Sequence, residues 1–125
     1  MDPSARRKIL GLVGLGIRGR RAVVGVQQVR DSARRGKLKL ALVAGDASKN
    51  SMDKVVPLLT ARGVPMLEGF GAEELGAACG RVAVSVVGVV DAGLARGMRD
   101  AAPHAVKSVG YAEASPAVRN QGGRF

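Results

Sequence analysis

Leu38-Lys39-Leu40-Ala41-Leu42-Val43-Ala44 is the stretch of the sequence that decides the fold. Every side chain in it except Lys39 is apolar. A short run that is apolar on both faces predicts a strand buried on both sides, as in a sheet covered by helices. Gly45 and Asp46 end this strand. We therefore expect a sheet with helices packed on both faces.

The segments on either side of this strand have helical spacing. Val26, Val29 and Ala33 share one face between Gly25 and Arg35, and Gly36 is placed to end that helix. A further helix follows the strand, with Ser48 or Asn50 as its N-cap and its end at Arg62-Gly63. The other expected elements are a first helix capped by Ser4 and reaching Ile17, strands at Val23-Val24, 64–67 and 82–90, and helices at 72–79 and, capped by Asp91, to Asp100.

Strands and helices therefore alternate along the chain, and right-handed crossovers place helices on both faces of a small, partly parallel sheet. The fold class is α/β, a three-layer α-β-α sandwich. A length of 125 residues suits one domain, which we place at residues 1–102. From Pro103 onward the sequence is rich in Ala, Ser, Pro, Gly and charge, so residues 103–125 are expected to be a basic, flexible tail.

The charge is strongly positive and unevenly distributed. The chain has 20 Lys and Arg against 10 Asp and Glu, a formal net charge of +10. Residues 1–39 contain eleven of these bases and only Asp2 and Asp31 as acids. Arginine favours bidentate contacts with phosphate, so this excess indicates a nucleic acid partner. A membrane surface is a weaker alternative, because no stretch combines the charge with a bulky apolar face.

The residue patterns do not favour catalysis. Gly14-Leu15-Gly16-Ile17-Arg18-Gly19 matches a dinucleotide-binding fingerprint by letter, but it lies in a helical pattern and no acid follows at the required distance. Cys79 and His104 are isolated, so neither a nucleophilic dyad nor a zinc site is expected, and Cys79 is interpreted as a core residue. Asp46 and Asp53 are interpreted as helix caps and dipole partners. We expect no catalytic residue, metal or cofactor.

The start of the second helix is better suited to binding. Gly25-Val26-Gln27-Gln28 opens this helix, where free N–H groups and the positive end of the helix dipole form an anion site. The amides of Gln27 and Gln28 are able to contact base edges, which would supply specificity. Both glutamines being merely solvated is an equally good interpretation.

Several short segments, in this order and spacing over residues 8–101, resemble the kink-turn RNA-binding ribosomal protein family of L-seven-Ae and L-thirty-e, and within it the bacterial YlxQ-type branch. They are Gly25-Val26-Gln27-Gln28-Val29, Arg35-Gly36-Lys37, Val43-Ala44-Gly45-Asp46-Ala47-Ser48, Gly63-Val64-Pro65, Glu74-Leu75-Gly76 and the run from Gly80 to Asp91. The resemblance implies an α-β-α sandwich with a four-stranded mixed sheet, RNA binding and no catalytic activity.

The resemblance also implies site residues. Gly25, Val26, Gln27 and Gln28 take the places of a Gly-Thr-Asn-Glu-type motif that contacts the tandem sheared G·A pairs of a kink-turn. Asp31 stands where the family has a lysine, so the positive charge would have to come from Arg20, Arg21, Arg30, Arg34 or Lys37. An apolar loop that packs near bulged nucleotides corresponds to Arg81, Val82, Ala83 and Val84.

We therefore expect a monomeric, non-catalytic RNA-binding protein whose partner is structured RNA, including ribosomal RNA. The alternative is a protein-interaction module that docks an acidic partner in a ribosome-assembly or transcription complex. A single cysteine excludes an internal disulfide and favours the reducing cytoplasm. The apolar run from Ile9 to Ile17 is about half as long as a membrane span, so neither a targeting signal nor a membrane partner is expected.

Overall fold

A computed structural model of the protein describes residues 1–107 and contains five α-helices and a mixed sheet. In chain order the elements are α1 (Pro3–Arg18), β1 (Ala22–Val24), α2 (Val26–Arg34), β2 (Leu40–Val43), α3 (Lys49–Ala61), β3 (Met66–Leu67), α4 (Ala72–Cys79), β4 (Val86–Val89), α5 (Ala92–Ala101), the 3-10 helix η1 (Pro103–Ala105) and β5 (Val106–Lys107). The alternation of strands and helices predicted from the sequence is confirmed.

The sheet has the strand order β1-β4-β2-β3-β5. β4 pairs antiparallel with both β1 and β2, β2 and β3 are parallel, and β5 is antiparallel to β3. The sheet is therefore mixed, but it has five strands where four were expected. The additional strand lies in the segment that we expected to begin the tail, and the rest of that predicted tail, 108–125, lies outside the described residues.

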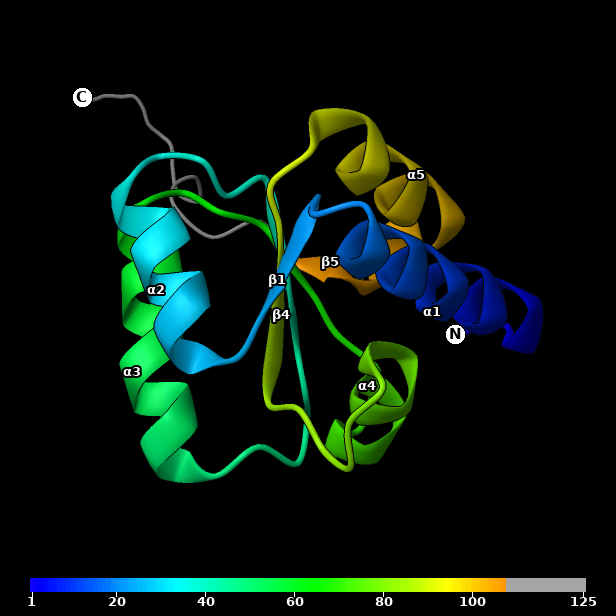
Figure 1. The fold of residues 1–125 in the computed structure, drawn as a ribbon, viewed down its shortest axis with the longest axis horizontal. Helices are drawn as coiled ribbons and strands as arrows, with labels where there is room; N and C mark the ends of the chain where they lie inside the picture. The colour runs from blue at the N-terminus through cyan, green and yellow to red at the C-terminus, as the bar shows by residue number, and fades with distance from the viewer. Residues whose placement is uncertain (108–125) are drawn as a thin grey trace.

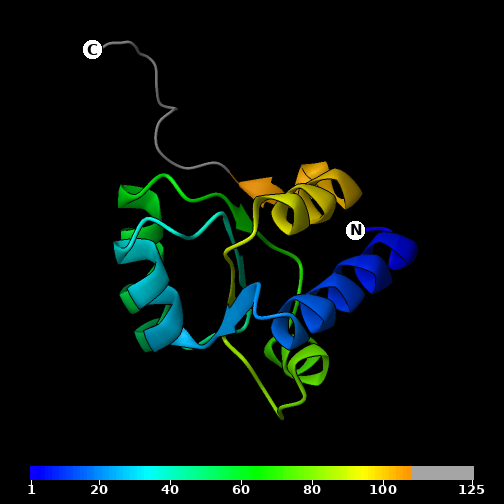
Figure 2. The ribbon, with the colours of Figure 1, turned by 45° about the horizontal axis from the view of Figure 1, so that its top comes forward.

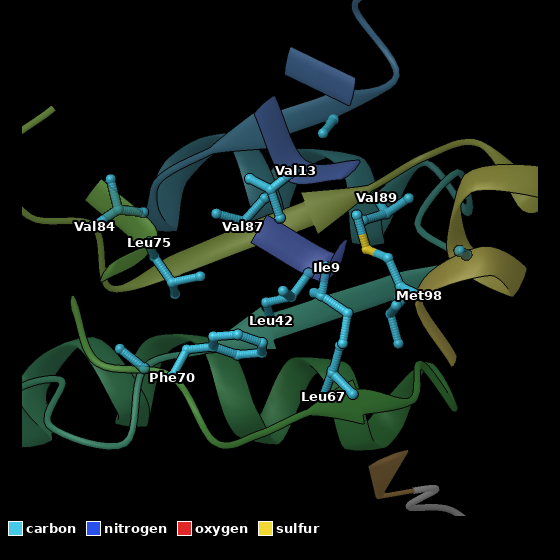
Figure 3. Close-up of a cluster of buried hydrophobic side chains, with 14 of the residues drawn as sticks. Ile9, Val13, Leu42, Leu67, Phe70, Leu75, Val84, Val87, Val89 and Met98 are labelled. Atoms are coloured by element: carbon cyan, nitrogen blue, oxygen red, sulfur yellow. The ribbon is translucent and has the colours of Figure 1, made fainter. Parts of the chain in front are cut away.

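The helices form one layer on each face of the sheet, which confirms the three-layer sandwich (Figures 1 and 2). α2 and α3 pack together on one face, while α1 packs against both α4 and α5 on the other. The core on the α1 side is built from aliphatic side chains around Phe70, and Figure 3 shows Ile9 and Val13 of α1 reaching into it. A second cluster under α2 and α3 includes Val29 and Leu59, both fully buried.

Capping explains most helix boundaries. Ser48 and Asp91 accept hydrogen bonds from backbone N–H groups in the first turns of α3 and α5, as predicted. The predicted cap of the first helix is wrong: Asp2, not Ser4, accepts from the N–H of Ala5, because Pro3 occupies the first helical position, where a missing N–H costs nothing.

The glycines of the dinucleotide-like motif lie inside α1, as expected for close packing. Gly14 and Gly16 are buried, and a Cβ atom on Gly16 would lie 2.6 Å from Cδ2 of Leu94. Glycine therefore allows α1 to approach α5 closely, and the motif lies inside a helix rather than at the strand-to-helix turn that a dinucleotide fingerprint requires.

The ends of the strands define two ends of the molecule, named by the orientation of Figure 1. At the lower end, β1 finishes at Val24 and β2 at Val43, beside the start of β4 at Val86. At the upper end, β1 begins at Ala22 and β2 at Leu40, both paired with Val89 near the end of β4. α2 and α3 start at the lower end and finish at the upper end.

Candidate functional site

Two backbone hydrogen bonds assemble the lower end. The N–H of Gly25 donates to the carbonyl of Val86 at 3.0 Å, and the N–H of Ala44 donates to that of Ser85 at 2.9 Å. The first turn of α2 is thereby held beside the segment that follows residues 81–84. The structure therefore brings together two of the segments that the sequence predicted as a binding site.

The first turn of α2 is open to a ligand. Gly25 is its N-cap with φ +96°, a conformation that favours glycine, and it offers no side chain to the free N–H groups. Gln27 and Gln28 are exposed, whereas Val26 is half-buried. Among the contacts of residues 1–107, the N–H donors of this turn have no acceptor, and the turn presents them with the positive end of the helix dipole.

The two glutamines are not equivalent. The amide Nε2 of Gln27 donates to the carboxylate of Asp31 at 3.1 Å, and Asp31 also forms an ion pair with Arg34 at 3.7 Å. Asp31 is therefore engaged by its own helix, which reduces the repulsion expected from an acid at this position. Within residues 1–107, the side-chain amide of Gln28 forms no hydrogen bond. It is therefore available to a partner.

A hollow of about 390 Å³ lies beside this turn, lined by Val26, Gln27, Arg30 and Lys54. Arg30 is fixed against α3, because its guanidinium donates to the carbonyl of Lys54. Lys54 was not predicted from the sequence. It reaches the site because α3 packs alongside α2, and the apolar spacing of each helix alone does not reveal that pairing.

Residues 81–84 form a loop fixed over α4. The N–H of Arg81 donates to the carbonyl of Gly76 at 2.7 Å, and that of Val84 donates to the carbonyl of Ala72 at 2.9 Å. Val82 is 90% exposed, while Val84 is buried in the core. The predicted strand at 82–90 is therefore shorter, and the predicted apolar loop presents Arg81, Val82 and Ala83 but not Val84.

The predicted basic residues do not surround the start of α2, as the sequence had suggested. Arg20 and Arg21 precede β1, and Arg34 and Lys37 lie at and after the end of α2, so all four belong to the upper end. At the lower end, Lys49 is paired with Asp53 at 2.8 Å, and the carboxylate of Asp46 caps α4 through the N–H of Ala72 at 2.8 Å. The lower end therefore carries little excess charge.

Sequence reasoning missed the extent of the basic surface at the upper end. The chain brings six further exposed bases there, some from beyond residue 39, where acids and bases nearly balance in the sequence: Arg18, Arg35, Lys39, Arg62, Arg96 and Arg99. Together with Arg20, Arg21, Arg34 and Lys37 they are called here the upper basic set. In the sequence, only their positions could have indicated this surface, because each base lies close to an expected element boundary or in the last helix.

Cys79, the last residue of α4, is a free and half-buried cysteine. Burial raises the pKa of the half-buried Cys79 thiol, although the nearby charge of Arg81 opposes this shift. Its packing against the core agrees with the predicted role. No cluster of three His, Cys, Asp or Glu side chains suited to a metal occurs within residues 1–107. Over the same span, every helix is too short or too polar to cross a membrane.

Comparison with known proteins identifies the family of this chain. The family model for "Ribosomal protein L7Ae/L30e/S12e/Gadd45 family" matches residues 8–98. The chain is 32% identical over 96 residues to the RNA-binding protein YlxQ of Enterococcus faecium, an alignment that covers 77% of this chain and 92% of the relative.

Solved structures agree with this assignment. A protein of unknown function from Bacillus halodurans is 29% identical, with a TM-score of 0.69, covering 75% of this chain and 95% of its own. A 15.5 kD RNA-binding protein of Giardia lamblia shares the fold at 21% identity and a TM-score of 0.67, covering 84% and 90%. The chain therefore belongs to the Ribosomal protein L7Ae/L30e/S12e/Gadd45 family, as a YlxQ-type member.

Proposed function

We propose that this protein is a non-catalytic RNA-binding protein that recognises a bent, structured RNA of the kink-turn type through its lower end. The observation that carries the proposal is the pairing of an open helix start with an exposed apolar loop. Gly25 donates to Val86, and this contact places the first turn of α2 at the same end of the sheet as the loop whose Val82 is 90% exposed.

The two parts of the lower end suit different parts of a bent RNA. The free N–H groups at the start of α2, together with Arg30 and Lys54, suit phosphate oxygens of the backbone. Gln28 suits base edges in a widened groove. Val82 suits the faces of bases that leave the stack at the bend. A straight duplex offers the phosphates but not the unstacked bases, so the surface favours bent RNA.

Asp31, which stands where the family has a lysine, is compatible with this mechanism. Its carboxylate holds the amide of Gln27 and pairs with Arg34, so part of its charge is offset within α2. Lys54, on the neighbouring helix, supplies a cation at the hollow beside the same turn. Support for RNA as the partner comes also from the family and from the YlxQ relative, which is named an RNA-binding protein.

The substitution Gln28→Ala tests the proposal. It removes a base-edge contact, and each good contact of this kind is worth about 1–3 kcal/mol, so affinity for a kink-turn RNA should fall about fivefold or more. Affinity for a straight duplex of the same composition should change little. Thr60→Ala, which truncates an exposed polar side chain near the end of α3, is the matched control. Fluorescence anisotropy with both RNAs measures the effect, and an equal loss on both would contradict recognition of the bend.

We also propose which RNA the protein binds and where in the cell it acts. A monomer of this fold offers one lower end and so takes one bent element of an RNA, for which ribosomal RNA is a candidate. The protein would act in the cytoplasm, alongside the translation or transcription machinery. An acidic protein partner at the lower end is the alternative, and it is less well supported because the family and the YlxQ relative favour RNA.

A further inference from the structure

We propose that the upper end of the molecule is a second, separate RNA-binding surface, which docks the phosphate backbone of a straight double-helical segment. This inference goes beyond the recognition of a bend at the lower end. It does not depend on it, because the two surfaces lie at opposite ends of the sheet and use different residues (Figure 1).

Backbone contacts bring distant segments together at the upper end. The N–H of Val90 donates to the carbonyl of Arg21 at 2.9 Å, and the N–H of Lys39 donates to the carbonyl of Val89 at 2.7 Å. Arg62 donates to the carbonyl of Arg34 at 3.2 Å, which joins the end of α3 to the end of α2. The chain therefore collects the upper basic set from four separate stretches of sequence.

The charge at this end is concentrated and largely unneutralised. All members of the upper basic set are exposed. Within residues 1–107, the one ion pair that any of them forms joins Arg34 to Asp31. Of the acids nearby, Asp91 caps α5 by accepting from the N–H of Leu94 at 2.8 Å, and Asp100 lies beside Arg96 and Arg99. A strong positive potential results, which attracts polyanions.

Capping of helix ends explains only part of this charge. α1, α2 and α3 all finish at the upper end, and cations such as Arg18 and Arg34 stabilise the negative ends of helix dipoles. Lys37 and Lys39 lie beyond any helix, however, and Arg96 lies in the middle of α5, outside both end turns. These bases therefore require a reason other than helix stability.

Arg20 adds an independent observation. It adopts φ +59°, the left-handed conformation that favours glycine. The N–H groups of Arg20 and Arg21 donate to Ile17 and Gly16 at 3.2 and 2.7 Å, the pattern in which a helix end normally carries glycine at this position. An arginine is thus kept, exposed and strained, where glycine would fold more favourably, as is frequent at binding sites.

The composition of the surface favours nucleic acid over an acidic protein. Most of the upper basic set is arginine, whose planar guanidinium binds phosphate in a bidentate manner. Protein interfaces depend on large apolar anchors. Among residues 1–107 the exposed large hydrophobic side chains are Met1, Leu15 and Val82, and only Leu15, in the last turn of α1, lies near the upper end. A hollow of about 330 Å³ is lined by Lys39, Arg96 and Arg99, with Asp100 as the one acid, and its excess of bases suits phosphate.

The test compares two charge-matched variants of the full chain. The upper variant is Arg21→Gln with Arg35→Gln, and the control is Arg7→Gln with Lys8→Gln, two exposed bases of α1 outside both surfaces. Binding of a straight RNA duplex is measured by anisotropy at several salt concentrations. The upper variant should lose about fivefold or more in affinity and reduce the salt slope by about 1–2, while the control changes little. Equal losses, or no loss in the upper variant, would overturn the proposal.

A further variant, Arg20→Gly, separates the effect on binding from the effect on folding. Glycine relieves the strained backbone, so the Tm should rise while the affinity for the straight duplex falls. A fall in Tm, or unchanged affinity, would count against the role of Arg20. The Gln28→Ala variant should leave straight-duplex binding intact, so a failure of kink-turn recognition and a failure of the upper surface are distinguishable. Tighter binding of an acidic polypeptide than of duplex RNA would also overturn the proposal.

Discussion

Val82 and Val84 stand two positions apart in one loop and have opposite exposures. Val82 is 90% exposed and Val84 only 5%. An aliphatic side chain in water contributes almost nothing to folding, whereas burying one contributes about 1.5–3 kcal/mol. Folding therefore explains the residue type at position 84 but not at position 82, where we propose that the side chain contacts RNA.

Serine substitutions at the two positions test this difference. Val82→Ser should change the free energy of unfolding by no more than about 0.5 kcal/mol and weaken kink-turn RNA binding severalfold. Val84→Ser should lower the free energy of unfolding by about 2 kcal/mol or more, because it removes buried methyl groups and buries a hydroxyl. Urea denaturation and anisotropy check the pair. A Val82→Ser protein with full RNA affinity would contradict the role of the loop.

At the scale of the elements, α4 fixes the position of the loop at 81–84. A Cβ atom on Gly76 would lie 2.7 Å from backbone atoms of Val82 and Ala83. A backbone neighbour cannot give way as the tip of a side chain does. Gly76 is therefore the residue that allows the loop to lie against α4.

A pair of glycine substitutions tests this contact. Gly76→Ala should lower the free energy of unfolding by about 1–3 kcal/mol and weaken kink-turn RNA binding, because the loop is displaced. Gly11→Ala is the control, since Gly11 lies in α1 with nothing within 4 Å of its Cβ position. It should raise the free energy of unfolding by about 0.5–1 kcal/mol. Thermal and urea unfolding measure both, and equal stability of the two variants would argue against a tight contact.

The elements also show how much the sequence predicted. Local signals were sufficient for α3, α4 and α5, whose caps Ser48, Gly80 and Asp91 lie where capping rules place them. The strand at β4 was predicted too long because apolar residues before Val86 resemble a strand, although Val84 donates its N–H to α4. β5 was missed because two residues carry no periodicity.

Most of the arginines that we expected around the start of α2 lie at the other end of the molecule, and this has a physical explanation. β1 runs down the sheet to Gly25, and α2 returns up its face, so residues before β1 and after α2 meet at one end. Gly25 and the two glutamines lie at the turning point, at the other end. Closeness in sequence therefore did not mean closeness in space, and the helix start and most of its expected arginines are separated by the length of α2.

At the scale of the whole molecule, the described fold does not stop at the domain boundary predicted at residue 102. The N–H of Glu68 donates to the carbonyl of Ala105 at 3.0 Å, and Lys107 forms an ion pair with Glu68 at 3.2 Å. Val106 packs against the core on the α1 side. β5 also covers the hydrogen-bonding edge of β3, which would otherwise be free to pair with another chain.

Two truncated chains test the boundary. A chain that ends at residue 102 should have a Tm several degrees below that of a chain that ends at residue 107, because it loses the packing of Val106 and the pairing of β3. It should also associate more readily at high concentration, since the edge of β3 is exposed. Calorimetry and light scattering measure these effects. Equal Tm values would place the boundary at 102 after all.

On our proposal, the separation of charge between the two ends also predicts how an RNA would arrive. The positive potential is strongest at the upper end, so a polyanion diffusing in solution is captured there first, at a rate that falls as ionic strength rises. Residence time at the lower end depends instead on short-range contacts, which salt screens weakly. We expect the upper end to set the speed of association and the lower end to set the lifetime of the complex.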